Sequence, residues 1–195
     1  GVRILFDGAW GFASSDVMTA GEVERVTRLA LNIAKASATL KDKKVRLAAE
    51  PAYQDLWTTP FITDPFAVAV DRKLALLFSV DKVLRKDSRI KSAISSMNFI
   101  REHQWHMTTE GWRIEQVLLS SGAGYIATAV DKREAQDRSY PSTHGGQTLS
   151  MGYELIESLD LLENAERVRG EAVALLTAPA CPGGRKDLIT YGNQL

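Results

Sequence analysis

The stretch that decides the fold is IKSAISSMNFIREHQWHMTTEGWRIEQVLLSSGAGYIATAV, residues 90–130. Its β-branched and aromatic content predicts strands over 90–100 and 98–107. Thr108–Gly111 predicts a hairpin loop, because glycine readily adopts the positive φ that such loops need. From Trp112 to Ser120 the side chains alternate in character with a period of two, which indicates the returning strand.

Two further strands are expected after this hairpin. Gly122-Ala123-Gly124 predicts a turn, and Tyr125–Val130 predicts the strand that follows it. Another strand is expected over Glu134–Ser139, and residues 141–153, rich in Ser, Thr, Gly and Gln, predict a surface loop or a strand-edge crossing. Together these segments predict an antiparallel meander.

The N-terminal residues predict a separate hairpin. Asp7-Gly8 is a strong turn signal between two short apolar runs, Val2–Phe6 and Trp10–Ala13. The chain opens on Gly1, inside the first of these strands and without methionine, so we expect that a segment upstream is missing.

Three helices are predicted. Thr19 precedes Glu22 by three residues, which is the spacing of a capping box, and apolar side chains then recur at three and four over residues 20–38. A second helix is expected from Asp71, as its cap, to about residue 86, and a third over residues 161–176.

The predicted fold class is α+β: a strand hairpin with a helix, then an antiparallel meander with flanking helices. We expect residues 1–44 to end an N-terminal α/β domain and residues 45–140 to form a central domain. Val45–Ala49 is expected as a strand, followed by an extended, proline-rich connector up to Phe66, in which Trp57 and Phe66 are anchored aromatics. Residues 141–195 are expected to supply a loop, a helix and, over Asp187–Tyr191, the first strand leading to a missing catalytic domain.

Composition excludes several classes of protein. Apolar residues make up 45% and charged residues 25%, which is ordinary for a globular protein. The 24 basic residues equal the 24 acidic ones, so we expect no nucleic-acid partner. No stretch is long and apolar enough to predict a membrane span. A single cysteine, Cys181, favours a reducing compartment, and hence the cytoplasm.

The histidines give no convincing site. His103 and His106 would share one face of a helix, but this segment predicts a strand, in which residues three apart face opposite ways. His144 lies in a glycine-rich segment with no nucleophile pattern, so a surface histidine is favoured over a catalytic one.

The other reactive side chains also favour structural roles. Glu154, Glu157 and Asp160 predict a solvated acidic face near a helix N-terminus. Cys181 predicts a plain loop thiol, with Arg185 and Lys186 only weakly favouring reactivity. The glycine pairs at 145–146 and 183–184 lack the spacing of a phosphate-binding loop. We therefore predict no catalytic, cofactor-binding or metal-ligating residue in this chain.

Three stretches resemble the TldD/PmbA family, once described as modulators of DNA gyrase. They are GVRILFDGAWGFASS at residues 1–15, the run from Trp57 to Phe66, and ERVRGEAVALLTAPACPGGRKDLITYGNQL at residues 166–195. Glu110-Gly111 and residues 136–139 also fit, so the likeness covers essentially the whole chain.

The resemblance implies a zinc metallopeptidase that processes or degrades peptides. In zinc-bearing members a His-Glu-x-x-x-His helix follows shortly after the stretch similar to Asn193-Gln194-Leu195. Two histidines four apart can bind zinc, and the glutamate can act as general base on a zinc-bound water. Because the sequence ends before that motif, we expect zinc only in the intact parent protein and an inactive fragment here.

The resemblance also bears on partners. It implies a peptide or unfolded protein as substrate, and a homodimer or a heterodimer with a paralogous subunit. The segment Asp187–Ile189 favours the zinc-bearing branch of the family. The alternative is a non-catalytic partner or regulatory subunit of the PmbA kind.

Overall fold

The computed structural model describes all residues except 41–42, 133, 191 and 193–195. It divides the chain into two compact units, Gly1–Pro51 and Ala52–Leu195. None of the helices in the described part of the chain is both long and apolar enough to cross a membrane.

The first unit is an antiparallel hairpin with one helix. Strand β1 (Val2–Phe6) pairs with β2 (Ala9–Ala13), and helix α1 spans Ala20–Ala38. Asp7 and Gly8 form the turn with φ of 44° and 76°, the two positive values that match the twist of a two-residue hairpin. The predicted hairpin and helix are confirmed.

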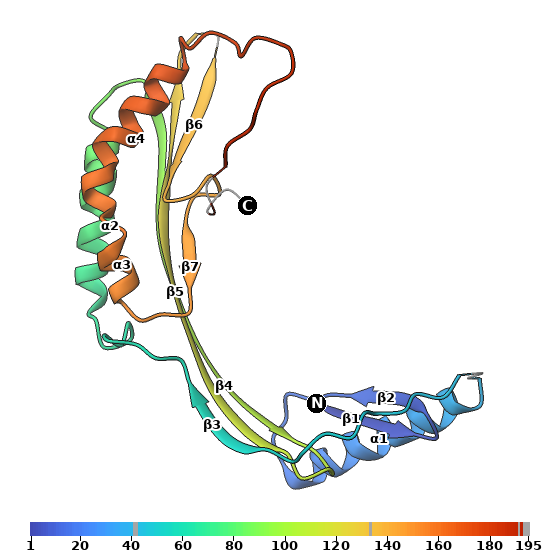
Figure 1. The fold of residues 1–195 in the computed structure, drawn as a ribbon. Helices are drawn as coiled ribbons and strands as arrows, with labels where there is room; N and C mark the ends of the chain where they lie inside the picture. The colour runs from blue at the N-terminus through green and yellow to red at the C-terminus, as the bar shows by residue number, and fades with distance from the viewer. Residues whose placement is uncertain (41–42, 133, 191, 193–195) are drawn as a thin grey trace. The chain divides into compact units, whose positions relative to one another are not determined.

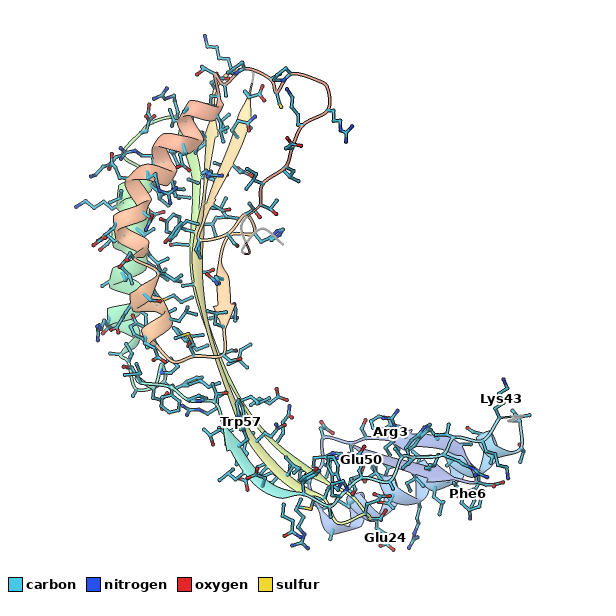
Figure 2. The ribbon with its side chains drawn as sticks, viewed as in Figure 1. Arg3, Phe6, Glu24, Lys43, Glu50 and Trp57 are labelled. Carbon is cyan, nitrogen blue, oxygen red and sulfur yellow. The ribbon has the colours of Figure 1, made fainter. Side chains whose placement is uncertain are left out.

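Helix α1 is held against the hairpin by small side chains. The Thr19 hydroxyl accepts a hydrogen bond from the Glu22 backbone N–H at 3.3 Å, which confirms the predicted cap. Ala30 is fully buried, and Gly11 of β2 lies so close that a Cβ there would be 2.0 Å from the Ala30 carbonyl oxygen. Glu24, on the far side of α1, is exposed (Figure 2). The contact therefore depends on the absence of a side chain at position 11.

The second unit is built on a five-stranded sheet with β5 (Arg113–Val130) at its centre. Strand β4 (Ile90–Met107) runs antiparallel along one edge of β5. The other edge of β5 pairs in turn with β3 (Gln54–Thr58), β7 (Gln147–Leu149) and β6 (Ala135–Tyr140). Of these three, β6 and β7 are antiparallel and β3 is parallel. The predicted α+β class and the antiparallel meander are confirmed (Figure 1).

The predicted turn at Gly122–Gly124 is wrong, because β5 runs straight through it. Neither glycine has a positive φ, so the backbone there is ordinary strand. A Cβ on Gly124 would lie 2.3 Å from the Gly145 carbonyl oxygen and 2.7 Å from that of Tyr140. Glycine is present because the backbone of the loop between β6 and β7 packs directly against β5 at this point.

Helices α2 (Val70–Leu84), α3 (Glu154–Ser158) and α4 (Leu161–Leu175) lie along one face of the sheet (Figure 1). The core between helices and sheet consists mainly of aliphatic and tyrosine side chains: Val80, Leu84, Tyr125, Ala127, Ala129, Ile156, Leu161, Ala165 and Val168. The Tyr125 hydroxyl donates to the Leu161 carbonyl at 3.0 Å, which ties the sheet to the start of α4.

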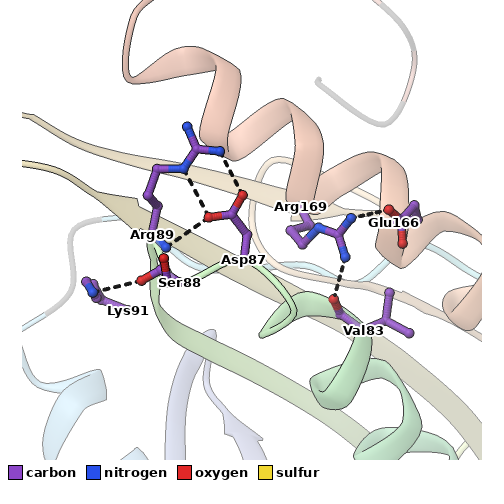
Figure 3. Close-up of polar contacts among 7 residues, drawn as sticks. All are labelled: Val83, Asp87, Ser88, Arg89, Lys91, Glu166 and Arg169. Atoms are coloured by element: carbon purple, nitrogen blue, oxygen red, sulfur yellow. Dashed lines mark hydrogen bonds and ion pairs between the residues drawn. The ribbon is translucent and has the colours of Figure 1, made fainter.

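Polar contacts join α4 to α2, and a second group of contacts braces the turn before β4 (Figure 3). Arg169 of α4 donates to the Val83 carbonyl at 3.1 Å and pairs with Glu166 one turn earlier. Asp87 and Arg89 form an ion pair of 2.8 Å in the turn before β4. This side-chain pair lowers the pKa of the Asp87 carboxyl well below its usual range.

Several smaller predictions fail. Val45–Ala49 and residues 187–190 are not strands, and Tyr191 lies outside the described residues. Helix α2 begins after Ala69 without a side-chain cap, and Asp71 lies inside its first turn. Trp57, which falls in the segment expected as a proline-rich connector, lies on β3 and is 45% exposed (Figure 2).

Candidate functional site

The outer edge of β4 is the first candidate for a binding surface. Arg113 donates its backbone N–H to Tyr53 at 2.9 Å, and Val117 accepts from Thr59 at 3.0 Å, so odd-numbered residues of β5 bond toward β3. Even-numbered residues of β5 therefore bond to β4, whose partners are also even, as in the pair His106 and Ile114. The odd-numbered residues of β4 turn their backbone groups away from β5. No strand in the described part of the chain pairs with them.

A cavity of about 290 Å³ lies elsewhere on the same sheet, and we call it the glycine trench. Its floor is Gly122, and its walls come from β4 and from the segment that leads into β7. The lining residues are Ser96, Asn98, Gly122, Ala123, His144, Gly145, Gly146, Gln147 and Thr148. Because Tyr125 points to α4 and side chains alternate along a strand, Gly122 faces away from the helices.

Register places a glycine between two polar side chains in the trench. Asn98 of β4, Gly122 of β5 and Thr148 of β7 form one row across the three strands. A Cβ on Gly122 would lie 2.4 Å from Thr148 Oγ1 and 2.8 Å from Asn98 Oδ1. Gly122 thus keeps open the space between these two side chains, rather than serving a backbone conformation.

The trench is polar but carries no carboxylate, ammonium or guanidinium group in its lining. In the part of the chain that the structure describes, the side chains of Asn98, Thr148 and His144 form no hydrogen bond with protein groups. Their donors and acceptors are therefore free to bind a ligand. His144, which the sequence favoured as a plain surface histidine, lies in this wall.

His103 and His106 lie on opposite faces of β4, as the strand period predicts. His103 Nε2 lies 2.6 Å from Glu115 Oε1, and its ring stacks on Trp105 with centroids 3.8 Å apart. His106 lies edge-on to Trp112, at 6.4 Å. Neither imidazole points toward the other.

The three acidic residues also separate. Glu157 forms an exposed ion pair of 3.2 Å with Arg72. Asp160 lies between α3 and α4 with a φ of 47°, and its side chain makes no capping hydrogen bond. Glu154 instead accepts backbone hydrogen bonds from Thr63 at 3.0 Å and Gly152 at 2.9 Å, which joins a segment before α2 to the start of α3.

The Glu154 carboxyl is held in its ionised form. Burial on its own raises the pKa of this carboxyl, but hydrogen bonding to the backbone at Thr63, Glu154, Gly152 and Ile62 together outweighs that effect. The net result is a pKa below the usual value. Glu154 is therefore a structural clamp that works as a carboxylate.

Replacing Glu154 with alanine is expected to lower the free energy of unfolding by about 2 kcal/mol at pH 7, because two backbone donors lose their acceptor. Since the folded-state pKa is lowered, this stabilisation is complete above about pH 4.5 and disappears as the pH falls through the folded-state pKa. Urea unfolding at pH 7, 5 and 3.5 measures the free energy of unfolding of the variant and of the original protein, and the difference between them should become smaller as the pH falls.

The matched control is Glu157→Ala in the same helix. Its carboxylate pairs only with Arg72 at the surface, so the expected loss is below about 0.5 kcal/mol. Equal losses for the two variants, or a Glu154→Ala loss that persists unchanged at pH 3.5, would contradict the clamp.

The remaining candidates supply no site. Cys181 is exposed, and Gly183 and Gly184 have open space where a Cβ would stand. Among the described residues no group of three or more His, Cys, Asp or Glu side chains is placed to hold a metal ion.

Comparison with known proteins identifies the family to which this fold belongs. Residues 63–176, which contain α2, the whole meander and α3, match the model of the PmbA/TldA metallopeptidase central domain. The chain belongs to the PmbA/TldD family. The glycine trench and the β4 edge both lie within the matched region.

Two archaeal relatives extend the match beyond the central domain. The chain is 26% identical over 188 residues to Metalloprotease MJ0996 of Methanocaldococcus jannaschii. It is 25% identical over 189 residues to a metalloprotease of Methanothermobacter thermautotrophicus. These alignments cover 96% and 97% of this chain but only 40% and 39% of the relatives.

A crystal structure supports the PmbA/TldD fold. A Thermotoga maritima protein described as a modulator of a DNA gyrase superposes with a TM-score of 0.65 over 93% of this chain and 38% of its own. The sequences are 17% identical, so this likeness concerns the fold alone.

Proposed function

We propose that this chain is the scaffold and substrate-guiding part of a TldD-like metallopeptidase that processes or degrades peptides. The observation that carries the proposal is the outer edge of β4, where an 18-residue strand has backbone groups directed away from β5. An extended peptide can add to such an edge through main-chain hydrogen bonds. Membership of the PmbA/TldD family supports the peptidase assignment.

Binding at a strand edge suits a substrate of varied sequence. Main-chain hydrogen bonds are the same for every residue except proline, so they select for an extended, unfolded segment. The zero net charge of the chain adds no long-range preference for acidic or basic substrates.

Zinc and assembly belong to the parent protein in this proposal. We place the zinc ligands outside this chain, which on its own would be inactive. This is consistent with the described residues, in which no group of three or more His, Cys, Asp or Glu side chains is placed to hold a metal ion. Relatives more than twice as long leave room for such a region. The parent would act in the cytoplasm as a homodimer or as a heterodimer with a paralogous subunit.

The test measures capture of an extended peptide by fluorescence anisotropy. The probe is a fluorescein-labelled decapeptide of alternating Ser and Val, and its N-methylated version is the control that cannot pair with a strand. His103→Pro removes one edge N–H of β4, since His103 is odd-numbered, and is expected to weaken binding about tenfold. His103→Ala removes the same side chain but keeps the N–H, and should bind as the original protein does.

Equal affinity for the proline and alanine variants would sink edge binding, as would equal affinity for the two peptides. Far-UV circular dichroism and urea unfolding of each variant show that the sheet persists. Proline at this position leaves the hydrogen bonds from β4 to β5 in place, because those come from even-numbered residues.

A further inference from the structure

We propose that the glycine trench binds a neutral amide group, either a peptide group or the side-chain amide of Asn or Gln. Nothing in the family match assigns a role to Asn98, Gly122 or Thr148. The inference rests on the proposed function only for the source of the amide, which would be the peptide substrate.

The shape of the trench selects a small, flat group. Glycine in the interior of a strand is unfavourable, and Gly122 has no positive φ to justify it. What glycine provides is a gap between Asn98 and Thr148, which one Cβ would fill. A cavity of about 290 Å³ is at the lower end of the range for ligand pockets, so it suits one or two residues rather than a large ligand.

The chemistry of the walls selects an amide. The Asn98 side chain offers both an N–H donor and a carbonyl acceptor, and the Thr148 hydroxyl can donate or accept. An amide presents the same pair of functions, an N–H and a C=O, in one plane. Asn98 and Thr148, on either side of Gly122, therefore offer a hydrogen-bond partner to both the N–H and the C=O of an amide.

The lining disfavours ionised ligands. A carboxylate or ammonium group that enters the trench loses part of its hydration, and the lining contains no ammonium, guanidinium or carboxylate group to pair with it. A purely apolar group would offer no hydrogen bond to the Asn98 amide or to the Thr148 hydroxyl. A neutral amide avoids both costs.

The test uses ¹H–¹⁵N correlation spectra of the whole chain. N-acetylglycinamide is the neutral probe, and N-acetylglycine is its carboxylate counterpart of nearly equal size. We expect saturable shifts of the Gly122, Gly146 and Thr148 backbone amides and of the Asn98 side-chain amide with the neutral probe. The carboxylate should bind at least fivefold more weakly.

Two variants and a matched control locate the site. Gly122→Ala fills the gap and should reduce affinity at least tenfold; its closest neighbours are the ends of the Thr148 and Asn98 side chains, which can rotate away. Thr148→Val removes the hydroxyl at nearly constant shape and should reduce affinity about fivefold. Thr128→Val makes the same change on the same face of β5, outside the trench, and should have no effect.

Unchanged binding by Gly122→Ala and Thr148→Val, shifts confined to residues outside the trench, or preference for the carboxylate would each overturn the proposal. The two proposals fail separately. If His103→Pro abolishes decapeptide binding while Gly122→Ala leaves the N-acetylglycinamide shifts intact, peptide binding at the β4 edge is supported and amide binding in the trench is rejected. The opposite pair of results supports amide binding in the trench and rejects peptide binding at the edge.

Discussion

Gly11→Ala is expected to unfold the first unit, with a loss of about 3 kcal/mol or more in its free energy of unfolding. The new Cβ would lie 2.0 Å from the Ala30 carbonyl oxygen and 2.4 Å from the Ala34 nitrogen. Both are backbone atoms of α1, so no side-chain rotation relieves the overlap and the whole helix must shift. Only a small buried cluster holds α1 against the hairpin, namely Ala13, Val26 and Ala30, so the unit has little stability with which to tolerate such a shift.

Gly21→Ala is the matched control, since no atom lies within 4 Å of its Cβ position and it lies in the first turn of the same helix. This variant should stabilise the unit by about 0.5–1 kcal/mol. Fluorescence of Trp10 during urea unfolding reports on this unit. A Gly11→Ala variant as stable as Gly21→Ala would show that the close packing of α1 on β2 is incorrect.

Gly124→Ala is expected to displace the loop between β6 and β7, at a cost of about 2–3 kcal/mol. Its Cβ would lie 2.3 Å from both the Gly145 carbonyl oxygen and the Gly146 Cα, and 2.7 Å from the Tyr140 carbonyl oxygen. All three are backbone atoms, so the loop must lift from β5. The trench would lose the wall that contains His144.

Gly170→Ala is the control for this variant. It lies in the middle of α4 with open space at its Cβ, so it should stabilise the second unit by about 0.5–1 kcal/mol. Urea unfolding by circular dichroism measures both changes, and amide spectra of residues 144–148 follow the loop. A Gly124→Ala variant with the stability of the original protein and unshifted loop amides would show that the loop does not pack against β5 at Gly124.

Local signals predicted the parts of the fold that depend on local interactions. The bounds of α1 follow from the Thr19 cap and the apolar period, and both are properties of neighbouring residues. The β1–β2 hairpin follows from Asp7-Gly8 in the same way. The α+β class and the meander could be predicted from the spacing of apolar side chains, which changes from a helical period to a strand period between segments.

Predictions failed where the deciding contact comes from far along the chain. Gly122 and Gly124 are turn residues by composition, and only the approach of residues 140–148 explains them within a strand. Strand β3 forms because it pairs with Arg113–Val117, which no local pattern in a proline-rich segment indicates. The short helix α3 depends on Glu154, which binds the backbone of a segment about 90 residues earlier.

The candidate site was missed for the same reason. Asn98 and Thr148 are 50 positions apart and meet only through their common partner Gly122. One signal was present: glycines at 122 and 124 are two positions apart and so fall on the same face of a strand, which is typical of a close backbone approach. That pattern indicates that another segment packs against the strand, but it does not identify which residues that segment supplies.

The central position of β5 has a consequence for the order of assembly. Strands β3, β4, β6 and β7 each pair with β5 and with no other strand in the described chain. The β4–β5 hairpin closes a loop of only a few residues, whereas β3 joins across 59 positions, from Gln54 to Arg113. The β5–β6 connection, from Val130 to Ala135, is equally short, and β7 joins across 24 positions, from Ala123 to Gln147. Loop-closure entropy therefore favours the β4–β5 and β5–β6 hairpins as the nucleus, with β7 next and the parallel strand last.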